Sequence, residues 1–329
     1  MSHGLTATDE MVYVRKEGVP WHGLGVGVEG VMTAEDAISM ARLNWQVTME
    51  PLYTTIRGRR VEVSSHLATV RSDTGTVLGV VSRQYQPLQN RDAFKFMDEL
   101  VASGEAKYHT AGSLLGGKRI WLLAEVPKTI EVVKGDTVKP YILLTNGHDG
   151  TLAIRAGTCL VRVICNNTLN MALGEIEGQF AAYHKGDVLS KVRDAREAIG
   201  LVVKSIDRAE ETFAVLARTQ YTSAKLDAYL NAVFPVRAMP HDPKRLPIWE
   251  AEFLTAKGRK DAVRQLVEVG AGADIPGVQG TYWGALQAVC DWADHLYRGS
   301  DQRRLNSVWF GERAAIKSKA ARTALEMCS

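Results

Sequence analysis

The fold is decided by a stretch in the middle of the chain, Lys139 to Leu173, which reads KPYILLTNGHDGTLAIRAGTCLVRVICNNTLNMAL. Two runs rich in Ile, Leu, Val and Thr flank the pentapeptide Asn146-Gly147-His148-Asp149-Gly150. Asn-Gly and Asp-Gly pairs supply residues that tolerate positive φ angles, and such pairs between β-branched runs are typical of hairpins. The stretch therefore predicts a β-hairpin whose turn lies at residues 146–150.

The second strand of this hairpin should alternate between two faces, because successive side chains of a strand point to opposite sides of the sheet. One face would carry Cys159 and Cys165, and the other face would carry Leu160 and Arg162. We expect Arg162 to point away from the core. Polar side chains after Cys165 can cap the segment that follows.

Length and composition are those of a soluble globular protein. The chain has 329 residues, of which 46% are hydrophobic and 23% charged, so it can form a large core in about two domains. No apolar run reaches the length of a membrane span, and residues 1–10 lack the basic-then-apolar order of a signal peptide. We therefore expect no membrane contact and a cytoplasmic location.

The cysteines and the net charge exclude several classes of site. The four cysteines form no Cys-x-x-Cys pair and no zinc-type spacing, which favours buried or incidental thiols. The formal net charge of +3 is too small for a bulk attraction to nucleic acid. Any anion-binding surface must therefore arise from the distribution of the charges.

The first half of the chain predicts strands with two short helices. β-Branched runs between residues 45 and 81 are broken by Gly and Asp, as in antiparallel hairpins. Thr33 and Asp36 approximate a capping box for a helix to about residue 42, and Asn90 is placed to cap a second helix to residue 102. The expected fold class is α+β, with a curved antiparallel β-meander and packed helices in a domain covering residues 1–186.

The second half, residues 187–329, has the periodicity of helices. Apolar residues recur at spacings near three and four from residue 187 to 218, which predicts one long central helix or two helices with a break near Gly200. Its apolar stripe could pack within the domain or face a neighbouring subunit. Helices are also predicted at 224–233, 257–269 and 281–295, and a proline-rich loop at 235–247.

Motifs for catalysis, cofactors and metals lack the neighbouring sequence features that such sites require. Gly25-x-Gly27-x-x-Gly30 matches the dinucleotide fingerprint in spacing, but it lacks a strand directly before it and a helix starting at the glycines. Asp291, Asp294 and His295 could share one helix face, yet no further ligand is identifiable. We predict no catalytic residue, no cofactor and no metal site.

Basic residues at predicted turns and strands are the remaining candidates for a binding site. Proteins that bind single strands combine a positive surface for the backbone with rings or guanidinium planes for the bases. The candidate nucleic-acid-binding residues lie on three predicted hairpins. They are Arg57, Arg59, Arg60, Lys118, Arg119, Arg155 and Arg162.

Five motifs, in the same order along the chain, resemble those of a phage/plasmid-like family known as domain of unknown function 932. They are Pro20-Trp21-His22-Gly23-Leu24-Gly25, Tyr85 to Asn90, Asn146 to Gly150, Arg162 to Leu169 and Trp283 to Val289. The resemblance implies an origin in phages, prophages or plasmids, and hence work on DNA in a bacterial cytoplasm. It implies no site residues.

At longer range, a helix, a curved antiparallel meander and a long helix in this order are similar to the core of phage single-strand annealing recombinases, which assemble on DNA. This similarity concerns the fold and assigns no role to any residue. The leading hypothesis is an oligomeric protein that binds single-stranded DNA and promotes annealing in phage or plasmid recombination and replication.

Two alternatives from other classes stay open. One is an enzyme acting on nucleotides or nucleic acid, with His148, Asp149 and Asn166 at a site on the central hairpin. The other is an adaptor that binds a host protein.

Overall fold

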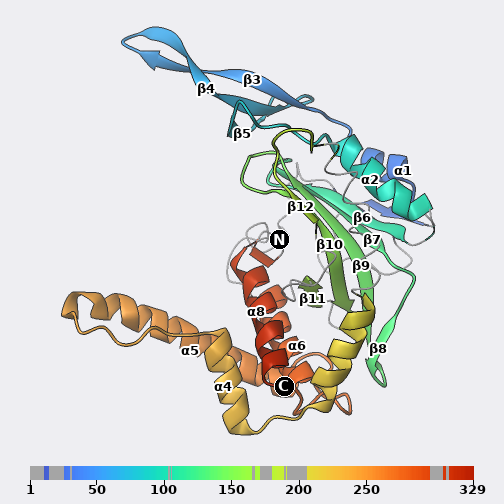
Figure 1. Cartoon of the computed structure of the whole chain (residues 1–329), viewed down its shortest axis with the longest axis vertical. Helices are drawn as coiled ribbons and strands as arrows, with labels where there is room; N and C mark the ends of the chain where they lie inside the picture. The colour runs from blue at the N-terminus through green and yellow to red at the C-terminus, as the bar shows by residue number, and fades with distance from the viewer. Residues whose placement is uncertain are drawn as a thin grey trace.

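A computed structural model of the chain describes residues 11–14, 26–29, 32–102, 104, 106–164, 167–170, 180–188, 190, 206–296, 307–308 and 311–329. The fold is α+β, as predicted, with a mainly helical C-terminal region (Figure 1).

The larger sheet has nine strands in the described part of the chain. Its central order is β11-β10-β9-β7-β6-β1-β2, with β12 also paired to β10 and β8 to β9. Neighbouring strands are antiparallel except for the parallel pair β1 and β2. The bounds are Met11–Val14 (β1), Val26–Val28 (β2), Lys107–Leu114 (β6), Arg119–Glu125 (β7), Ile130–Val133 (β8), Asp136–Gly147 (β9), Ile154–Arg162 (β10), Asn167–Asn170 (β11) and Phe180–Ala182 (β12).

The predicted central hairpin is confirmed. β9 and β10 pair antiparallel, with Arg155 opposite Thr145 at one end and Arg162 opposite Val138 at the other. The connection covers residues 148–153 rather than the predicted 146–150, because Asn146 and Gly147 still pair within β9. Gly150 in this connection has a φ angle of 77°, a value that glycine adopts without the strain a side chain would bring.

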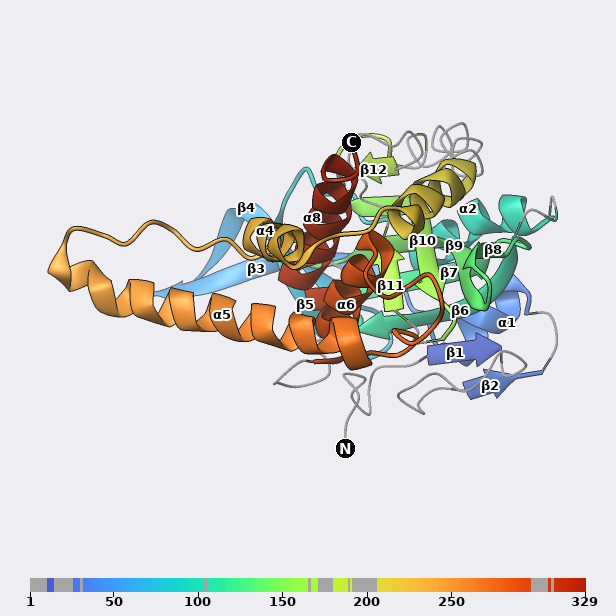
Figure 2. The same cartoon turned by 90° about the horizontal axis from the view of Figure 1, so that it is seen from below.

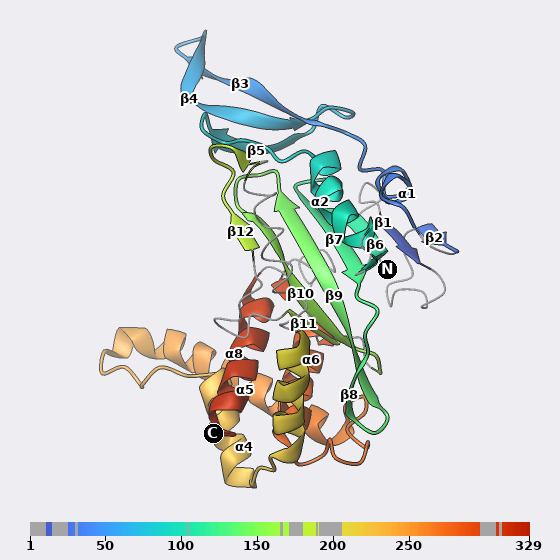
Figure 3. The same cartoon turned by 45° about the vertical axis from the view of Figure 1, so that its right-hand side comes forward.

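A separate three-stranded sheet is formed by β3 (Val47–Ile56), β4 (Arg59–Arg71) and β5 (Val77–Ser82), in the order β3-β4-β5. β5 pairs only with residues 66–70 of β4, so the distal part of β3 and β4 is a ribbon of two strands. Figures 1 and 3 show this ribbon projecting beyond the end of the larger sheet. We call residues 51–64 the β arm.

Two N-terminal helices pack on the larger sheet. α1 (Ala34–Met40) begins at the predicted capping box, in which the Thr33 hydroxyl accepts a hydrogen bond from the Asp36 backbone N–H and the Asp36 carboxylate accepts one from the Thr33 N–H. α2 (Asn90–Ala102) buries Phe94 and Met97 in the main core. Figure 3 shows both helices beside β6 and β7.

The helices of the second half gather at the other end of the larger sheet from the β arm (Figure 3). Residues 206–218 are helical, as predicted, whereas residues 191–205 of the predicted long helix lie outside the described residues. The other helices are α4 (Ser223–Val233), a 3-10 turn at Pro243–Arg245, α5 (Leu246–Val269), α6 (Tyr282–His295) and α8 (Glu312–Glu326).

Helix α5 differs from its prediction. It begins at Leu246 rather than near Lys257, so it takes up the end of the predicted proline-rich loop. Pro247 lies in the first turn, where a missing N–H breaks no helical hydrogen bond. Its N-terminal half projects away from the rest of the molecule (Figures 1 and 2).

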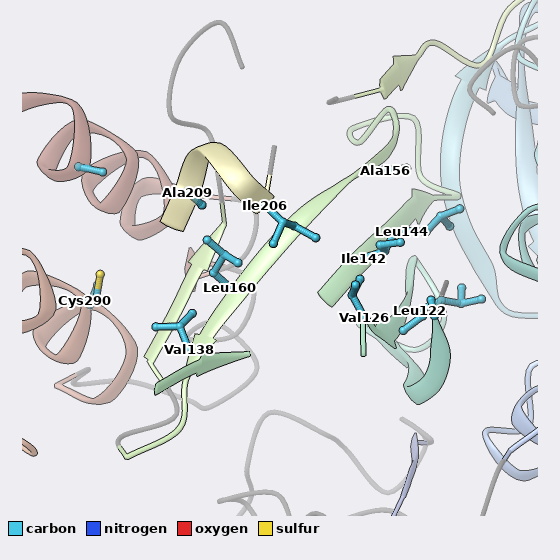
Figure 4. Close-up of a cluster of buried hydrophobic side chains, with 14 of the residues drawn as sticks. Leu122, Val126, Val138, Ile142, Leu144, Ala156, Leu160, Ile206, Ala209 and Cys290 are labelled. Atoms are coloured by element: carbon cyan, nitrogen blue, oxygen red, sulfur yellow. The ribbon is translucent and has the colours of Figure 1, made fainter. Parts of the chain in front are cut away.

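One hydrophobic core runs from the larger sheet into the C-terminal helices. Figure 4 shows Leu160 of β10 close to Ile206 and Ala209, and these residues belong to the same buried cluster as Leu122 and Cys290. In the described part of the chain, no helix combines the length and the apolar character that crossing a membrane requires.

Candidate nucleic-acid interface

The tip of the β arm holds three of the predicted binding residues. Arg57 and Gly58 form the two-residue turn, with φ angles of 51° and 76°. Positive φ at both central positions gives a turn whose twist matches that of the flanking strands. Arg57, Arg59 and Arg60 are all exposed. The turn therefore holds three guanidinium groups at the far end of the arm.

Tyr53 lies beside this cluster and was not predicted as a site residue. Tyr53 is opposite Glu62, and Arg60 is opposite Thr55, so Tyr53 and Arg60 are diagonal neighbours on one face of the ribbon. The Arg60 guanidinium carbon lies 3.7 Å from the centre of the Tyr53 ring. The sequence would have indicated this pair if Arg57-Gly58 had been assigned as the turn, because the turn sets the register of both strands.

The carboxylate of the β arm is paired with Arg83, the residue that directly follows β5. Glu62 is the acidic residue of the arm, residues 51–64. Its Oε1 atom lies 2.9 Å from Nη2 of Arg83, and the Nε atom of Arg83 donates to the Ser64 carbonyl. The arginines at the tip thus keep their excess positive charge.

A second group of predicted residues lies at the end of the larger sheet. Lys118 and Arg119 are half-buried at the turn between β6 and β7, and Arg155 is exposed on β10. Arg119 donates from Nη2 to the Thr151 hydroxyl, 3.1 Å away. The Lys118 carbonyl accepts a hydrogen bond of 2.8 Å from the His148 N–H. These contacts join the β6–β7 turn to the β9–β10 connection.

The three-stranded sheet that carries the arm packs against this same end of the larger sheet. The Thr69 hydroxyl of β4 donates to the His148 carbonyl at 2.7 Å, and the Tyr85 hydroxyl donates to the Gly147 carbonyl at 2.7 Å. Gly79 of β5 passes so close to the loop that a Cβ atom there would lie 2.5 Å from Cα of Asp149. The two groups of cations are therefore held by one framework, one at the tip of the arm and the other beyond its base. The arm itself, with about seven residues in each strand, is roughly 20 Å long at ~3.3 Å per residue.

The exposure expected for Arg162 is wrong. Its side chain is 3% exposed, and its Nε and Nη2 atoms each donate a 2.7 Å hydrogen bond to Asp136. Its Nη1 atom donates to the Ala271 carbonyl, and the indole N–H of Trp283 donates to the same carboxylate of Asp136. The reason is that Leu160 and Arg162 share the face of β10 that packs on the C-terminal helices. Arg162 joins sheet to helices and is not available to a phosphate.

Two residues of the alternative enzyme site, His148 and Asp149, make hydrogen bonds within the fold. His148 is fully buried, and its Nε2 atom lies 2.9 Å from Oδ1 of Asn90. Burial lowers the pKa of His148 to about 3, with a further lowering from nearby His184. The Asp149 carboxylate accepts hydrogen bonds from the backbone N–H and the hydroxyl of Thr151. Asn166 lies outside the described residues.

The carboxylates of the face considered for a metal lie beside basic side chains. The Lys317 ammonium lies 2.7 Å from Oδ1 of Asp294, and both side chains are buried. His295 and Asp291 approach within 3.9 Å. Among the residues that the structure describes, no group of three or more His, Cys, Asp or Glu side chains could hold a metal ion.

Comparison with known proteins finds relatives in Escherichia coli. The chain is 41% identical over 73 residues to UPF0380 protein YafZ of Escherichia coli (strain K12), which covers 22% of this chain and 24% of YafZ. It is 27% identical over 128 residues to UPF0380 protein YfjQ of the same organism, covering 39% of this chain and 44% of YfjQ. The chain therefore spans less than half the length of either relative. No solved structure matches.

A family profile matches most of the chain. It covers residues 77–317, from the first residue of β5 into α8, and thus leaves the β arm outside the matched region. The matched region contains Lys118, Arg119 and Arg155. The chain belongs to the family described as Domain of unknown function (DUF932).

Proposed function

We propose that this protein binds single-stranded DNA, with the β arm and the group Lys118, Arg119 and Arg155 as its contact surface. The observation that carries the proposal is the tip of the arm. Arg57, Arg59 and Arg60 are exposed there, and within the described part of the chain no carboxylate is ion-paired with any of them. Such unpaired guanidinium groups on an exposed turn suit phosphate contacts.

The shape of the arm supports the same function. A two-stranded ribbon that projects from a rigid base can follow a nucleic-acid backbone while the body of the protein stays clear of it. Contacts that hold phosphates leave the bases of a single strand accessible for pairing. Annealing of complementary strands, with several copies of the protein along the DNA, is the activity that we propose for phage or plasmid recombination and replication.

The experiment is a salt titration of binding to a fluorescein-labelled oligonucleotide, followed by fluorescence anisotropy. Each phosphate that the protein neutralises on a single strand contributes about 0.7 to the slope of log K against log salt. Replacing Arg57, Arg59 and Arg60 together with Ala should reduce the magnitude of this slope by roughly 2 if each contacts one phosphate.

The matched control replaces three exposed cations near the start of α5, namely Arg237, Lys244 and Arg245, with Ala. This variant has the same change in net charge and should keep the wild-type slope. If the wild-type protein shows no salt-sensitive binding, or if both triple variants lose slope equally, the proposal is wrong.

A further inference from the structure

Arg60 lies over the ring of Tyr53, an arrangement that phosphate binding alone does not require. Phosphate contact needs only charge, whereas here the guanidinium carbon of Arg60 lies over an aromatic ring, 3.7 Å from its centre, on a ribbon that projects into solvent. Tyr53 is 46% exposed. A large aromatic side chain kept at the surface by a cation, far from the core, presents planar surface to a ligand.

We infer that the Tyr53–Arg60 pair is a base-stacking site, which takes one unpaired base of a single-stranded nucleic acid. This inference rests on the proposed function and names the contact that separates single strands from duplexes. Aromatic rings and guanidinium planes stack on the faces of bases irrespective of sequence. In a duplex both faces of each base are covered by neighbouring bases, so an unpaired base is the partner that fits.

The surroundings of the pair favour an anionic, planar ligand. Glu62, directly across the ribbon from Tyr53, is held by Arg83 and so does not repel a phosphate. The phosphates on either side of the stacked base would lie near Arg57 and Arg60. Arg59 belongs to the opposite face of the ribbon, because it pairs with Ile56 while Arg60 pairs with Thr55.

An exchange of arginine for lysine separates the effect of charge from that of the planar group. Arg60→Lys keeps the charge but removes the planar group from the ring, and Arg237→Lys makes the same change at an exposed position outside the proposed contact surface. Tyr53→Leu removes the ring, and Tyr53→Phe keeps it. All four changes are at exposed positions, and unchanged circular dichroism would show that the variants fold.

The measurements are the anisotropy titration described above and the fluorescence of an oligonucleotide that contains 2-aminopurine, which is quenched on stacking. Tyr53→Leu and Arg60→Lys should each weaken single-strand binding roughly five-fold or more and reduce the quenching, since stacking is worth about 1–3 kcal/mol per base. The slope against salt should stay the same. Tyr53→Phe and Arg237→Lys should bind within about two-fold of wild type, a change too small for loss of a stacked base.

A sealed DNA hairpin of the same base composition completes the test. Tyr53→Leu should lower single-strand affinity toward that of the hairpin duplex and leave duplex binding unchanged. If wild-type protein binds single strands with the expected salt dependence but Tyr53→Leu binds equally well, the stacking site is refuted and the proposed function stands. If the wild-type protein binds neither DNA, both fail.

Discussion

Arg162 and Asp136 form a buried, bidentate ion pair, with two hydrogen bonds of 2.7 Å between the guanidinium group and the carboxylate. Asp136 is the first residue of β9 and Arg162 the last of β10, so the pair closes the open end of the central hairpin. Trp283 of α6 donates to the same carboxylate, and the Ala271 carbonyl accepts from the guanidinium. The pair thus connects the sheet to the C-terminal helices.

Asp136→Ala should lower the free energy of unfolding by about 3–5 kcal/mol, because it leaves the guanidinium group of Arg162 buried without a counter-charge. Urea unfolding measures this loss. Asp227→Ala breaks the exposed pair of Asp227 with Arg264 and should cost no more than about 1 kcal/mol. An Arg162→Ala variant with wild-type stability and a reduced salt slope of DNA binding would contradict the structural role.

The stability of the protein should fall as the pH is lowered, in part through His148. Burial lowers the pKa of His148 from 6.5 in the unfolded chain to about 3 in the folded one. The unfolded chain therefore takes up a proton below pH 6.5 that the folded chain does not. The contribution of neutral His148 to the free energy of unfolding is complete above pH 6.5. It is lost progressively as the pH falls toward 3, at up to roughly 1.4 kcal/mol per pH unit.

His148→Gln should flatten this dependence, because glutamine cannot take up the proton. Urea midpoints between pH 4 and 8 measure the slope in both proteins. Burial also lowers the pKa of His184, so part of the slope should remain in the variant. Equal slopes in wild type and variant would mean that His148 is not held neutral in the folded state.

Gly79→Ala should destabilise the protein by about 1–3 kcal/mol, the range for overpacking, because the new Cβ atom would lie 2.5 Å from the Asp149 backbone. Gly258→Ala is the matched control. Gly258 lies within α5, and a Cβ atom there would have no neighbour within 4 Å, so alanine should stabilise the helix by about 0.5–1 kcal/mol. Thermal unfolding compares the two. If Gly79→Ala left stability unchanged, β5 would not be tightly packed on the 148–153 loop.

The second group of cations should contribute to binding independently of the arm. Lys118→Ala with Arg155→Ala should reduce the slope of log K against log salt by about 1.4, two phosphates at 0.7 each. The double control Lys225→Ala with Lys257→Ala, on α4 and α5, should leave the slope unchanged. If the Lys118 and Arg155 double variant keeps the wild-type slope while the arm variants lose slope, the DNA-binding surface is confined to the arm.

The parts of the fold that could be predicted are those whose cause is local. The Thr33–Asp36 capping box, the hairpin of β9 and β10 and the helix over Tyr282–His295 each depend on residues close to one another in the sequence. Arg57, Arg59 and Arg60 were assigned to an exposed turn for the same reason. Tyr53 was missed because its contact with Arg60 crosses two strands and depends on their register.

What the amino-acid sequence determined by itself is the alternation of β-branched runs with Gly and Asp turns, the helical periodicity of the second half and the placing of arginines at a turn. These follow from backbone sterics and side-chain spacing within single segments. Tertiary structure decided which face of β10 is buried. Arg162, which the sequence suggests as a DNA-binding residue, therefore lies on the buried face and pairs with Asp136. The alternation of a strand defines two faces, but only the helices packed against one of them decide which face is buried.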